Sequence, residues 1–297
     1  MTIAINTPNG LSNIGKRPNQ EDSVYPSVGS ATEDSRLFIV CDGMGGHNHG
    51  ELASQAVCNS MSGFINEHWN GDVFQDQLLT NALHEAIREI NKLDDGSPQK
   101  PGTTMTFLCI HRGGILAAHI GDSRIYHIRP TERRILYKSR DHSLAYDMFL
   151  AGEITKDEIA TYPKKSVLTR TILPNQERLP KPDIVHIKDI QSGDYFILAT
   201  DGIFETMTDD ELISLMCEEI TNKEKCQKLS LMTQDNADNH SAYMIKVKEV
   251  EVEEGDEQFA DDEATVRYNA ILLEGSPTPS KQSFASKVIN KIKVLCK

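Results

Sequence analysis

Three apolar runs of this 297-residue chain each end in an aspartate. "FIVCD" ends at Asp42, "AAHIGD" at Asp122 and "FILATD" at Asp201. One aspartate after a strand commonly starts a turn, but three such strand ends in one fold would bring carboxylates together. Buried carboxylates at close range repel one another strongly. We therefore expect strands that end at one common edge, where shared protons or divalent cations compensate the charge.

Two further aspartates extend this pattern. Asp238 lies just before the apolar run of "DNADNHSAYMIKV", and Asp22 ends the acidic pair of "KRPNQEDS". Oxygen ligands without cysteine suit hard ions such as Mg²⁺ and Mn²⁺. Glycines after Asp42 and Asp201 allow a backbone carbonyl or a substrate to approach closely. The set predicts a two-metal site that activates water for phosphoryl transfer.

The order of the expected elements indicates the fold class. Apolar periodicity predicts strands at 36–41, 134–139, 183–187, 194–200, 241–247 and 265–274, and a hairpin around the turn 112–114. Helical spacing predicts helices at 50–66, 74–93, 143–160, 209–220 and 222–233. Strands and helices come in blocks rather than in strict alternation. This order favours a layered α+β domain over a doubly wound parallel sheet.

Composition limits the partners and the compartment. The net charge of −13 argues against nucleic acid as the main partner. No charged start followed by an apolar run marks a signal peptide, and no run approaches the roughly 20 apolar residues of a membrane span. The six cysteines include no CxxC pair, so we expect reduced thiols and a cytoplasmic protein.

The C-terminal part of the chain differs in character from the rest. We expect a catalytic domain over 1–274, which includes an acidic loop at 249–263 and the extra strand at 265–274, and a linker with a basic tail over 275–297. The acidic loop is interpreted as a solvated connection, with a calcium loop as the alternative. Residues 284–297 carry an apolar helical face among lysines, which fits a membrane surface or an acidic partner. The simpler interpretation is a helix packed on its own domain, or a frayed tail.

The motifs of the chain occur in the order typical of one enzyme family. The chain resembles the metal-dependent Ser/Thr protein phosphatases, the protein phosphatase 2C family, in a bacterial form, with core motifs over 9–247. The resemblance rests on "GKRPNQEDS", "VCDGMGGH", "GTTMTFLCI", "HIGDSRIY", "SRDHS", "VLTRTIL", "FILATDGIFETMTDDEL" and "DNHSAYMIKV". It implies a four-layer α-β-β-α sandwich with two central antiparallel β-sheets. It also implies a binuclear Mn²⁺ or Mg²⁺ centre at one end of the sandwich.

The resemblance assigns the ligands of this centre. Asp42 would bridge both metals, and the carbonyl of Gly43 would bind one of them. Asp201 and Asp238 would bind the metal on the other side. Of these ligands Asp238 departs most from the family pattern, since histidine and serine follow its Asp-Asn pair.

Four further residues take supporting roles by the same resemblance. Asp22, with Glu21 beside it, would hold the centre mostly through metal-bound water. Asp122 matches the position that helps to bind a third, weaker metal. Arg17 matches the arginine that binds the substrate phosphate, and a planar guanidinium suits a phosphate bidentately.

The motifs do not assign the residue that would act as general acid. Many eukaryotic relatives have a histidine directly after Asp-Gly, where this chain has Met44. His47 is the nearest substitute and is a candidate catalytic residue, with His49 as another. The alternative is that His47 forms only structural hydrogen bonds.

Together these features predict a protein serine/threonine phosphatase. A hydroxide that bridges the two metals would attack the phosphorus of phosphoserine or phosphothreonine in line. We expect phosphorylated Ser/Thr proteins as partners, a cognate Ser/Thr kinase system, no nucleic acid, and a monomer. The alternative is a catalytically inactive relative that binds phosphoproteins as a regulatory interaction module.

Overall fold

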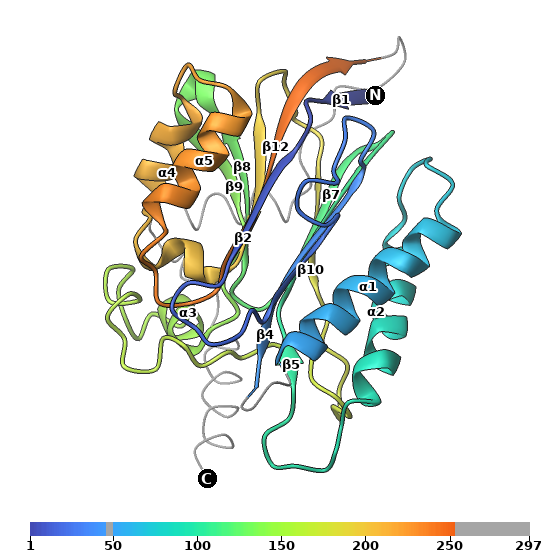
Figure 1. Cartoon of the computed structure of the whole chain (residues 1–297), viewed down its shortest axis with the longest axis vertical. Coiled ribbons are helices and arrows are strands. Elements are labelled where there is room, and N and C mark those ends of the chain that lie inside the picture. Colours follow the sequence, from blue (N-terminus) through green and yellow to red (C-terminus); the bar gives the residue numbers. More distant parts are fainter. Residues whose placement is uncertain (46–49, 253–297) are drawn as a thin grey trace.

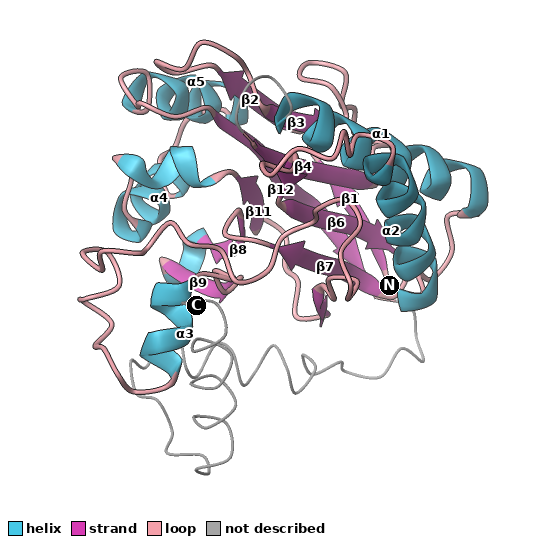
Figure 2. Ribbon diagram, turned by 90° about the horizontal axis from the view of Figure 1, so that it is seen from below, coloured by secondary structure: helices cyan, strands magenta, loops and turns pink. Residues whose placement is uncertain are grey.

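Two antiparallel sheets stack face to face, and helices cover their outer faces (Figure 1). This computed structural model describes residues 1–45 and 50–252. Seen from below, α1 and α2 lie on one side of the sheets, and α4 and α5 lie on the other (Figure 2). The layers confirm the predicted α+β class and the α-β-β-α sandwich.

Each sheet has six strands. The first, called here the β12 sheet, has the order β1-β12-β11-β8-β9, with β2 also paired to β12. Its strands are β1 (Thr2–Ile5), β2 (Asn9–Asn13), β8 (Arg124–Arg129), β9 (Arg134–Lys138), β11 (Tyr195–Ala199) and β12 (His240–Glu251). The second, called the β4 sheet, has the order β10-β7-β6-β4-β3, with β5 paired to β4. Its strands are β3 (Asp22–Tyr25), β4 (Leu37–Met44), β5 (Gly102–Thr103), β6 (Met105–His111), β7 (Gly114–Ile120) and β10 (Asp183–Ile187).

Four of the helices pack on the sheets in two pairs, α1 with α2 and α4 with α5. The five helices of the described ranges are α1 (Gly50–His68), α2 (Asp76–Asn91), α3 (Leu144–Leu150), α4 (Asp209–Met216) and α5 (Asn222–Met232). The helices α4 and α5 each begin with a capping box, Thr208 with Glu211 and Thr221 with Glu224. Each box satisfies two backbone N–H groups that a helix start leaves without partners.

Successive side chains of each strand point to opposite faces of its sheet, and this alternation divides the core into three layers. In β4, Ile39 and Cys41 face α1 and α2, whereas Phe38 and Val40 face the other sheet. In β11, Phe196 lies between the sheets. The neighbouring residues of β11 belong to the layer under α4 and α5. Burying one such aliphatic or aromatic side chain contributes about 1.5–3 kcal/mol.

The chain crosses between the sheets directly after β7. The predicted hairpin is correct for β6 and β7, but the next strand, β8, pairs with β9 and β11 of the other sheet. The crossing takes only the residues 121–123. At this corner the hydroxyls of Thr104 and Ser123 are 2.7 Å apart. Asp122 therefore lies at the junction of the two sheets.

Several predicted bounds were wrong, each for a local reason. The helix expected over 143–160 ends at Leu150, because Gly152 takes a left-handed conformation (φ +76°) two residues later and stops the helix. The helix expected over 209–220 ends at Met216, before Glu218 and Glu219, whose charges are unfavourable at a helix C-terminus.

The strands β1, β2 and β3 were not predicted, because they are short and their apolar patterns are weak. In β2 only Leu11 is buried, and the strand is held by its pairing with β12. At the other end of the chain, β12 extends to Glu251 and pairs with β1, so 249–251 belong to a strand and not to the predicted acidic loop. The remainder of that loop, the strand at 265–274 and the tail at 275–297 lie outside the described residues.

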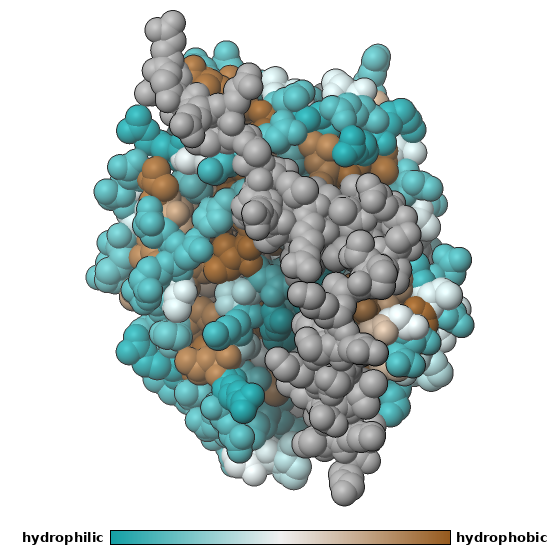
Figure 3. All heavy atoms as spheres, turned by 180° about the vertical axis from the view of Figure 1, so that it is seen from behind, coloured by the Kyte–Doolittle hydropathy of each residue, from teal (hydrophilic) through white to brown (hydrophobic). Residues whose placement is uncertain are grey.

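The surface of the described residues combines hydrophobic and hydrophilic side chains. In Figure 3, on the area drawn in colour, hydrophobic residues occur in small groups between hydrophilic ones. None of the helices in residues 1–45 and 50–252 has the length and hydropathy required to cross a membrane.

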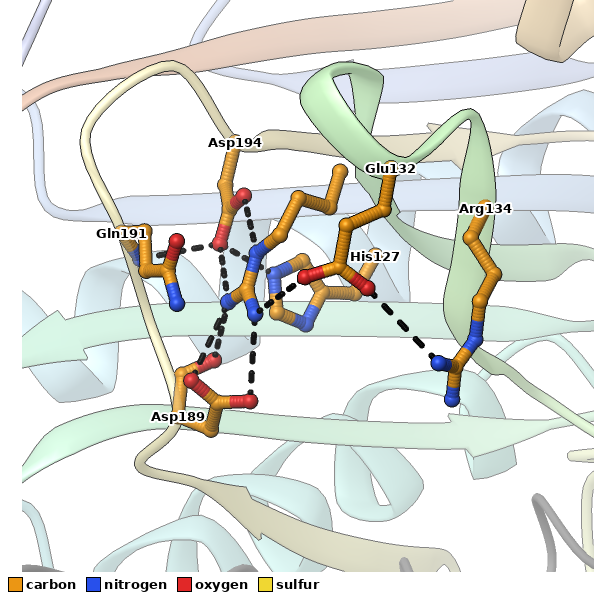
Figure 4. Close-up of polar contacts among 7 residues, drawn as sticks. His127, Glu132, Arg134, Asp189, Gln191 and Asp194 are labelled. Atoms are coloured by element: carbon orange, nitrogen blue, oxygen red, sulfur yellow. Dashed lines mark hydrogen bonds and ion pairs between the residues drawn. The ribbon is translucent and has the colours of Figure 1, made fainter.

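A buried ionic network connects the strands at one end of the β12 sheet (Figure 4). Asp194 is 1% exposed and accepts hydrogen bonds from Arg129 at 2.9 Å, from His127 at 2.8 Å and from the backbone N–H of Gln191 at 2.9 Å. Arg129 also donates to Asp189. Burial alone would raise the pKa of Asp194, but its hydrogen bonds with His127 and Arg129 hold that pKa below the ordinary value. The network thus compensates every buried charge that it contains.

We predict that Asp194→Asn destabilises the fold by about 3 kcal/mol, because it leaves the buried Arg129 without its main counter-charge. Chemical denaturation would measure the change. Glu132→Gln is the matched control, since it removes one negative charge from the exposed rim of the network, 3.5 Å from Arg129. The control should cost less than about 1 kcal/mol. Equal costs for the two variants would contradict this interpretation.

Candidate metal centre

Carboxylates from both sheets meet at the end of the sandwich opposite the Asp194 network. Asp22 begins β3 and Asp42 lies in β4, whereas Asp201 follows β11 and Asp238 precedes β12. Burial raises the pKa of Asp42, and the carboxylates of Asp22, Asp201 and Asp122 lie close enough to raise it further. The structure therefore brings together the aspartates that the sequence singled out.

Asp22 and Asp42 are directly opposite each other on adjacent antiparallel strands. Like charges in this position destabilise a sheet unless a cation lies between them. One oxygen of Asp22 accepts a hydrogen bond from the hydroxyl of Thr200, at 3.0 Å across the sandwich. The other oxygen, Oδ1, is buried without a hydrogen-bond partner. An unpartnered buried carboxylate oxygen is the kind of atom that a metal ion or its bound water would satisfy.

The electrostatics of this cluster are unfavourable without cations. Burial, together with the neighbouring carboxylates, raises the pKa of Asp22 to about 7 and that of Asp122 to about 8. The same causes raise the pKa of Asp42 well above its ordinary value and raise that of Asp201. This all-oxygen donor set fits a hard divalent cation.

Arg17 lies at the rim of the cluster, paired with a predicted ligand. Its guanidinium donates to Oδ2 of Asp238 at 2.7 Å, and its side chain is 53% exposed. Burial raises the pKa of Glu21, although Arg17 opposes that shift. Arg17 is thus an exposed cation within reach of the carboxylates.

Two glycines allow the backbones around the cluster to pack closely. A Cβ on Gly43 would lie 2.2 Å from the carbonyl oxygen of Gly50 and 2.5 Å from that of Glu21. A Cβ on Gly121 would lie 2.5 Å from Thr104, and Gly121 also has a positive φ of 104°. These glycines therefore fix the positions of the adjacent Asp42 and Asp122.

Asn239 is a site residue whose role the sequence did not reveal. Its side-chain oxygen accepts from the backbone N–H of Glu21 at 2.8 Å, and its amide donates to the carbonyls of Ile14 and Asn19. It therefore attaches the segment that carries Arg17 to the start of β12. The Asp-Asn pair was visible in the sequence, but only the asparagine's position between two distant segments explains it.

An ion pair beside the cluster was also missed. Arg124 donates two hydrogen bonds to Asp141, at 2.8 and 2.7 Å, and its guanidinium lies 4.7 Å from the ring centre of Phe204. Arg124 lowers the pKa of Asp122 and of Asp201, whereas Asp141 raises both. The motifs "HIGDSRIY" and "SRDHS" contain these residues, but sequence spacing could not show that they pair.

Within residues 1–45 and 50–252, His119, His142 and Asp183 form a group apart from the aspartate cluster, and their possible ligand atoms all lie within 4.8 Å of one another. Its hydrogen bonds indicate a structural role. His142 Nδ1 accepts from the N–H of Gly121 at 3.0 Å, and His142 Nε2 lies 3.1 Å from Asp183. The backbone of His142 also donates to the carbonyl of Gly121. His142 therefore holds the corner that carries Asp122.

His47, the candidate general acid, lies outside the described residues. Met44, which stands where relatives have the histidine, is the last residue of β4 and pairs with Gly102 of β5. The catalytic role of His47 therefore stays a prediction.

Comparison with known proteins identifies the family. The family model described as protein phosphatase 2C matches residues 9–234. The protein phosphatase PhpP of Streptococcus pneumoniae is 29% identical over 248 residues, which cover 82% of this chain and 98% of that protein. The serine/threonine phosphatase PstP of Mycobacterium tuberculosis is 27% identical over 201 residues, 67% of this chain and 36% of PstP.

Solved structures agree with this assignment. A serine/threonine phosphatase of S. agalactiae aligns with a TM-score of 0.70 and 25% identity, covering 81% of this chain and 99% of that one. The catalytic domain of PstP, solved with two manganese ions, aligns with a TM-score of 0.67 and 24% identity, covering 84% of this chain and 100% of that one.

The chain belongs to the protein phosphatase 2C family. The class of enzyme predicted from the motifs, a metal-dependent protein serine/threonine phosphatase, is thereby confirmed.

We predict that Mn²⁺ or Mg²⁺ stabilises the fold. An ion at about 100 times its Kd adds about 2.7 kcal/mol, which corresponds to a rise in Tm of roughly 5–10 °C. Thermal unfolding with added metal or with EDTA measures the rise. Asp42→Asn should abolish most of it, whereas the exposed control Asp210→Asn should keep it. A rise of equal size in both variants would place the ion elsewhere.

We also predict a pH dependence from the scaffold behind Asp122. Burial, followed by repulsion from His142, lowers the pKa of His119 to about 3. The folded state therefore holds His119 neutral, while the unfolded chain protonates it near pH 6.5. Stability from this residue is complete above pH 6.5 and falls towards pH 3, by up to about 1.4 kcal/mol per pH unit.

The rings of His119 and His142 are stacked, with their centroids 4.4 Å apart. His119→Phe keeps an aromatic ring against His142 but cannot take up a proton. Urea unfolding in EDTA at pH 7.5, 6 and 5 should give a shallower loss of stability for the variant than for the wild type. An equal loss of stability in the variant and the wild type between pH 7.5 and 5 would contradict the lowered pKa of His119.

Proposed function

We propose that this phosphatase hydrolyses phosphoserine and phosphothreonine in proteins at the aspartate cluster between β3, β4, β11 and β12. One observation carries the proposal. Four carboxylates, buried on Asp22 and half-buried on Asp42, Asp122 and Asp201, lie together with raised pKa values. Perturbed groups of this kind concentrate at functional sites.

The proposal assigns the metal ligands as the sequence does. Asp42 and the Gly43 carbonyl come from the β4 sheet, while Asp201 and Asp238 come from the β12 sheet, so the ions would lie between the sheets. When bound, two Mn²⁺ or Mg²⁺ ions would supply an activated water and neutralise charge on the phosphoryl oxygens. Asp22 would contact the same centre through water, with Glu21 beside it.

Asp122 would serve a third, weaker ion. Its place on the crossing between β7 and β8 puts it at the edge of the cluster. Two sets of contacts stabilise this edge. His142 is hydrogen-bonded to Gly121, and Arg124 forms an ion pair with Asp141.

Arg17 would bind the substrate phosphate. Its present partner is Asp238, at 2.7 Å. If Asp238 held a metal ion instead, the guanidinium would be free to donate two N–H groups to phosphoryl oxygens. Its exposed side chain, 53% accessible, supports this role, because a protein substrate could reach it. A cognate Ser/Thr kinase, a monomeric state and a contact through 284–297 remain predictions.

We predict that Asp201→Asn lowers kcat on a phosphothreonine peptide by at least about 10³-fold, because the neutral amide is a poor ligand for a hard cation. The protein should stay folded, since the carboxylate is already disfavoured by burial. Kinetics with Mn²⁺, together with circular dichroism, measure both properties.

Asp210→Asn is the isosteric control and should keep full activity, because Asp210 is exposed on α4. Full activity of Asp201→Asn would refute the assigned centre. A well-folded wild type without turnover in any metal would instead favour the inactive, phosphoprotein-binding alternative.

A further inference from the structure

A basic groove lies one strand away from the aspartate cluster. It measures about 780 Å³ and is formed by the segment 168–173 and the returning segment 176–181. We call it the 168–181 groove. Its lining side chains include the apolar Leu168, Leu173, Leu179 and Pro180, and the basic Arg170, Arg178 and Lys181.

Backbone pairing fixes the position of the groove beside the site. Ile172 exchanges two hydrogen bonds of 3.0 Å with Thr103, and Thr103 pairs with Gly43. The hydroxyl of Thr103 donates to the carbonyl of Asp42 at 2.9 Å. One wall of the groove is therefore joined at Ile172 to β5, and β5 pairs with β4, which carries the predicted ligand Asp42.

The walls of the groove are held rigidly by polar contacts. Arg170 donates to the carbonyl of Lys181 at 2.9 Å and to Asp183 at 2.5 Å, so it joins the two walls and its own charge is compensated. Gln176 accepts from the N–H of Leu173 and donates to the carbonyl of Thr171. A groove that is formed in advance loses less entropy when it binds an extended peptide.

Two cations of the groove remain available. Arg178 and Lys181 are exposed, and neither side chain pairs with any residue in the described ranges. Glu177, the acidic residue between 168 and 181, does not line the groove. The chain as a whole carries a charge of −13, which repels acidic ligands at long range. A local basic groove beside the catalytic end therefore favours acidic ligands at this one place.

We propose that the 168–181 groove binds acidic residues that flank the phosphorylated residue of a protein substrate. Arg178 and Lys181 would pair with glutamate or aspartate side chains, while Leu173 and Leu179 would contact the peptide between them. This inference rests on the proposed function, and it adds a substrate class, namely phosphosites next to acidic sequence. The groove continues towards α1 and α2, because Leu179 also lines a second hollow of about 420 Å³ with Phe64 and Ile87.

The test compares phosphothreonine peptides that differ only in the flanking residues, either four glutamates or four glutamines. For the wild type, kcat/KM should be about fivefold higher with glutamate at low salt, as expected for two exposed ion pairs. The preference should shrink at 0.5 M NaCl, because salt screens exposed charges. Arg178→Glu and Lys181→Glu should each abolish or reverse it.

Lys223→Glu is the matched control. It makes the same change in charge at an exposed position on α5, which covers the other sheet, and it should keep the preference. Turnover of p-nitrophenyl phosphate, which is too small to reach the groove, should be the same in all four proteins. Loss of the preference in the control as well would indicate only net charge, and an unchanged preference in Arg178→Glu would overturn the proposal.

Failure of the proposed function can be distinguished from failure of the groove. Fluorescence anisotropy of the same labelled peptides in EDTA measures binding without turnover. A wild type that binds the glutamate peptide more tightly than the glutamine peptide, with the difference lost in Arg178→Glu, would support the groove even without hydrolysis. Equal binding of both peptides by the wild type would overturn it.

Discussion

The repulsion among buried carboxylates is the constraint on which the rest of the structure depends. Asp22 and Asp42 are paired across β3 and β4, and Asp201 approaches Asp42 from the other sheet. No basic side chain in the described residues forms an ion pair with Asp22 or Asp42, whereas Arg129 pairs with Asp194 at the opposite end of the sandwich. One end of the same two sheets is therefore electrostatically complete, and the other end requires an ion.

Much of this arrangement could be predicted from sequence, because the strongest patterns are local. Buried runs such as "FIVCD" identify a strand and its terminal carboxylate at once, and the order of the motifs indicates the family and hence the sandwich. The short strands β1 to β3 could not be predicted, since β2 buries only Leu11 and depends on β12 for its hydrogen bonds. Propensity cannot reveal a strand whose stability comes from a partner more than 200 residues away.

For the site too, local patterns could be predicted and long-range contacts could not. The aspartates were visible because each follows or precedes an apolar run. The residues that orient them were not: Arg124 meets Asp141 only through the fold, and His142 holds Gly121 by one ring nitrogen and its own backbone. Asn239 connects the segment 14–21 to the start of β12, two segments that no spacing rule relates. Supporting contacts of this kind are set by tertiary geometry, whereas the ligand types are set by the chemistry of the ion.

The division of the ligands between two sheets has a mechanical consequence. Asp22 and Asp42 move with the β4 sheet, whereas Asp201 and Asp238 move with the β12 sheet. An ion bound by ligands from both sheets would stabilise their relative position and oppose sliding of one sheet over the other. By thermodynamic reciprocity, if the ion favours one relative position of the sheets, a change that favours the same position must strengthen the binding of the ion. Mutations in the apolar layer between the sheets, far from any carboxylate, would then tune how tightly the metal is held.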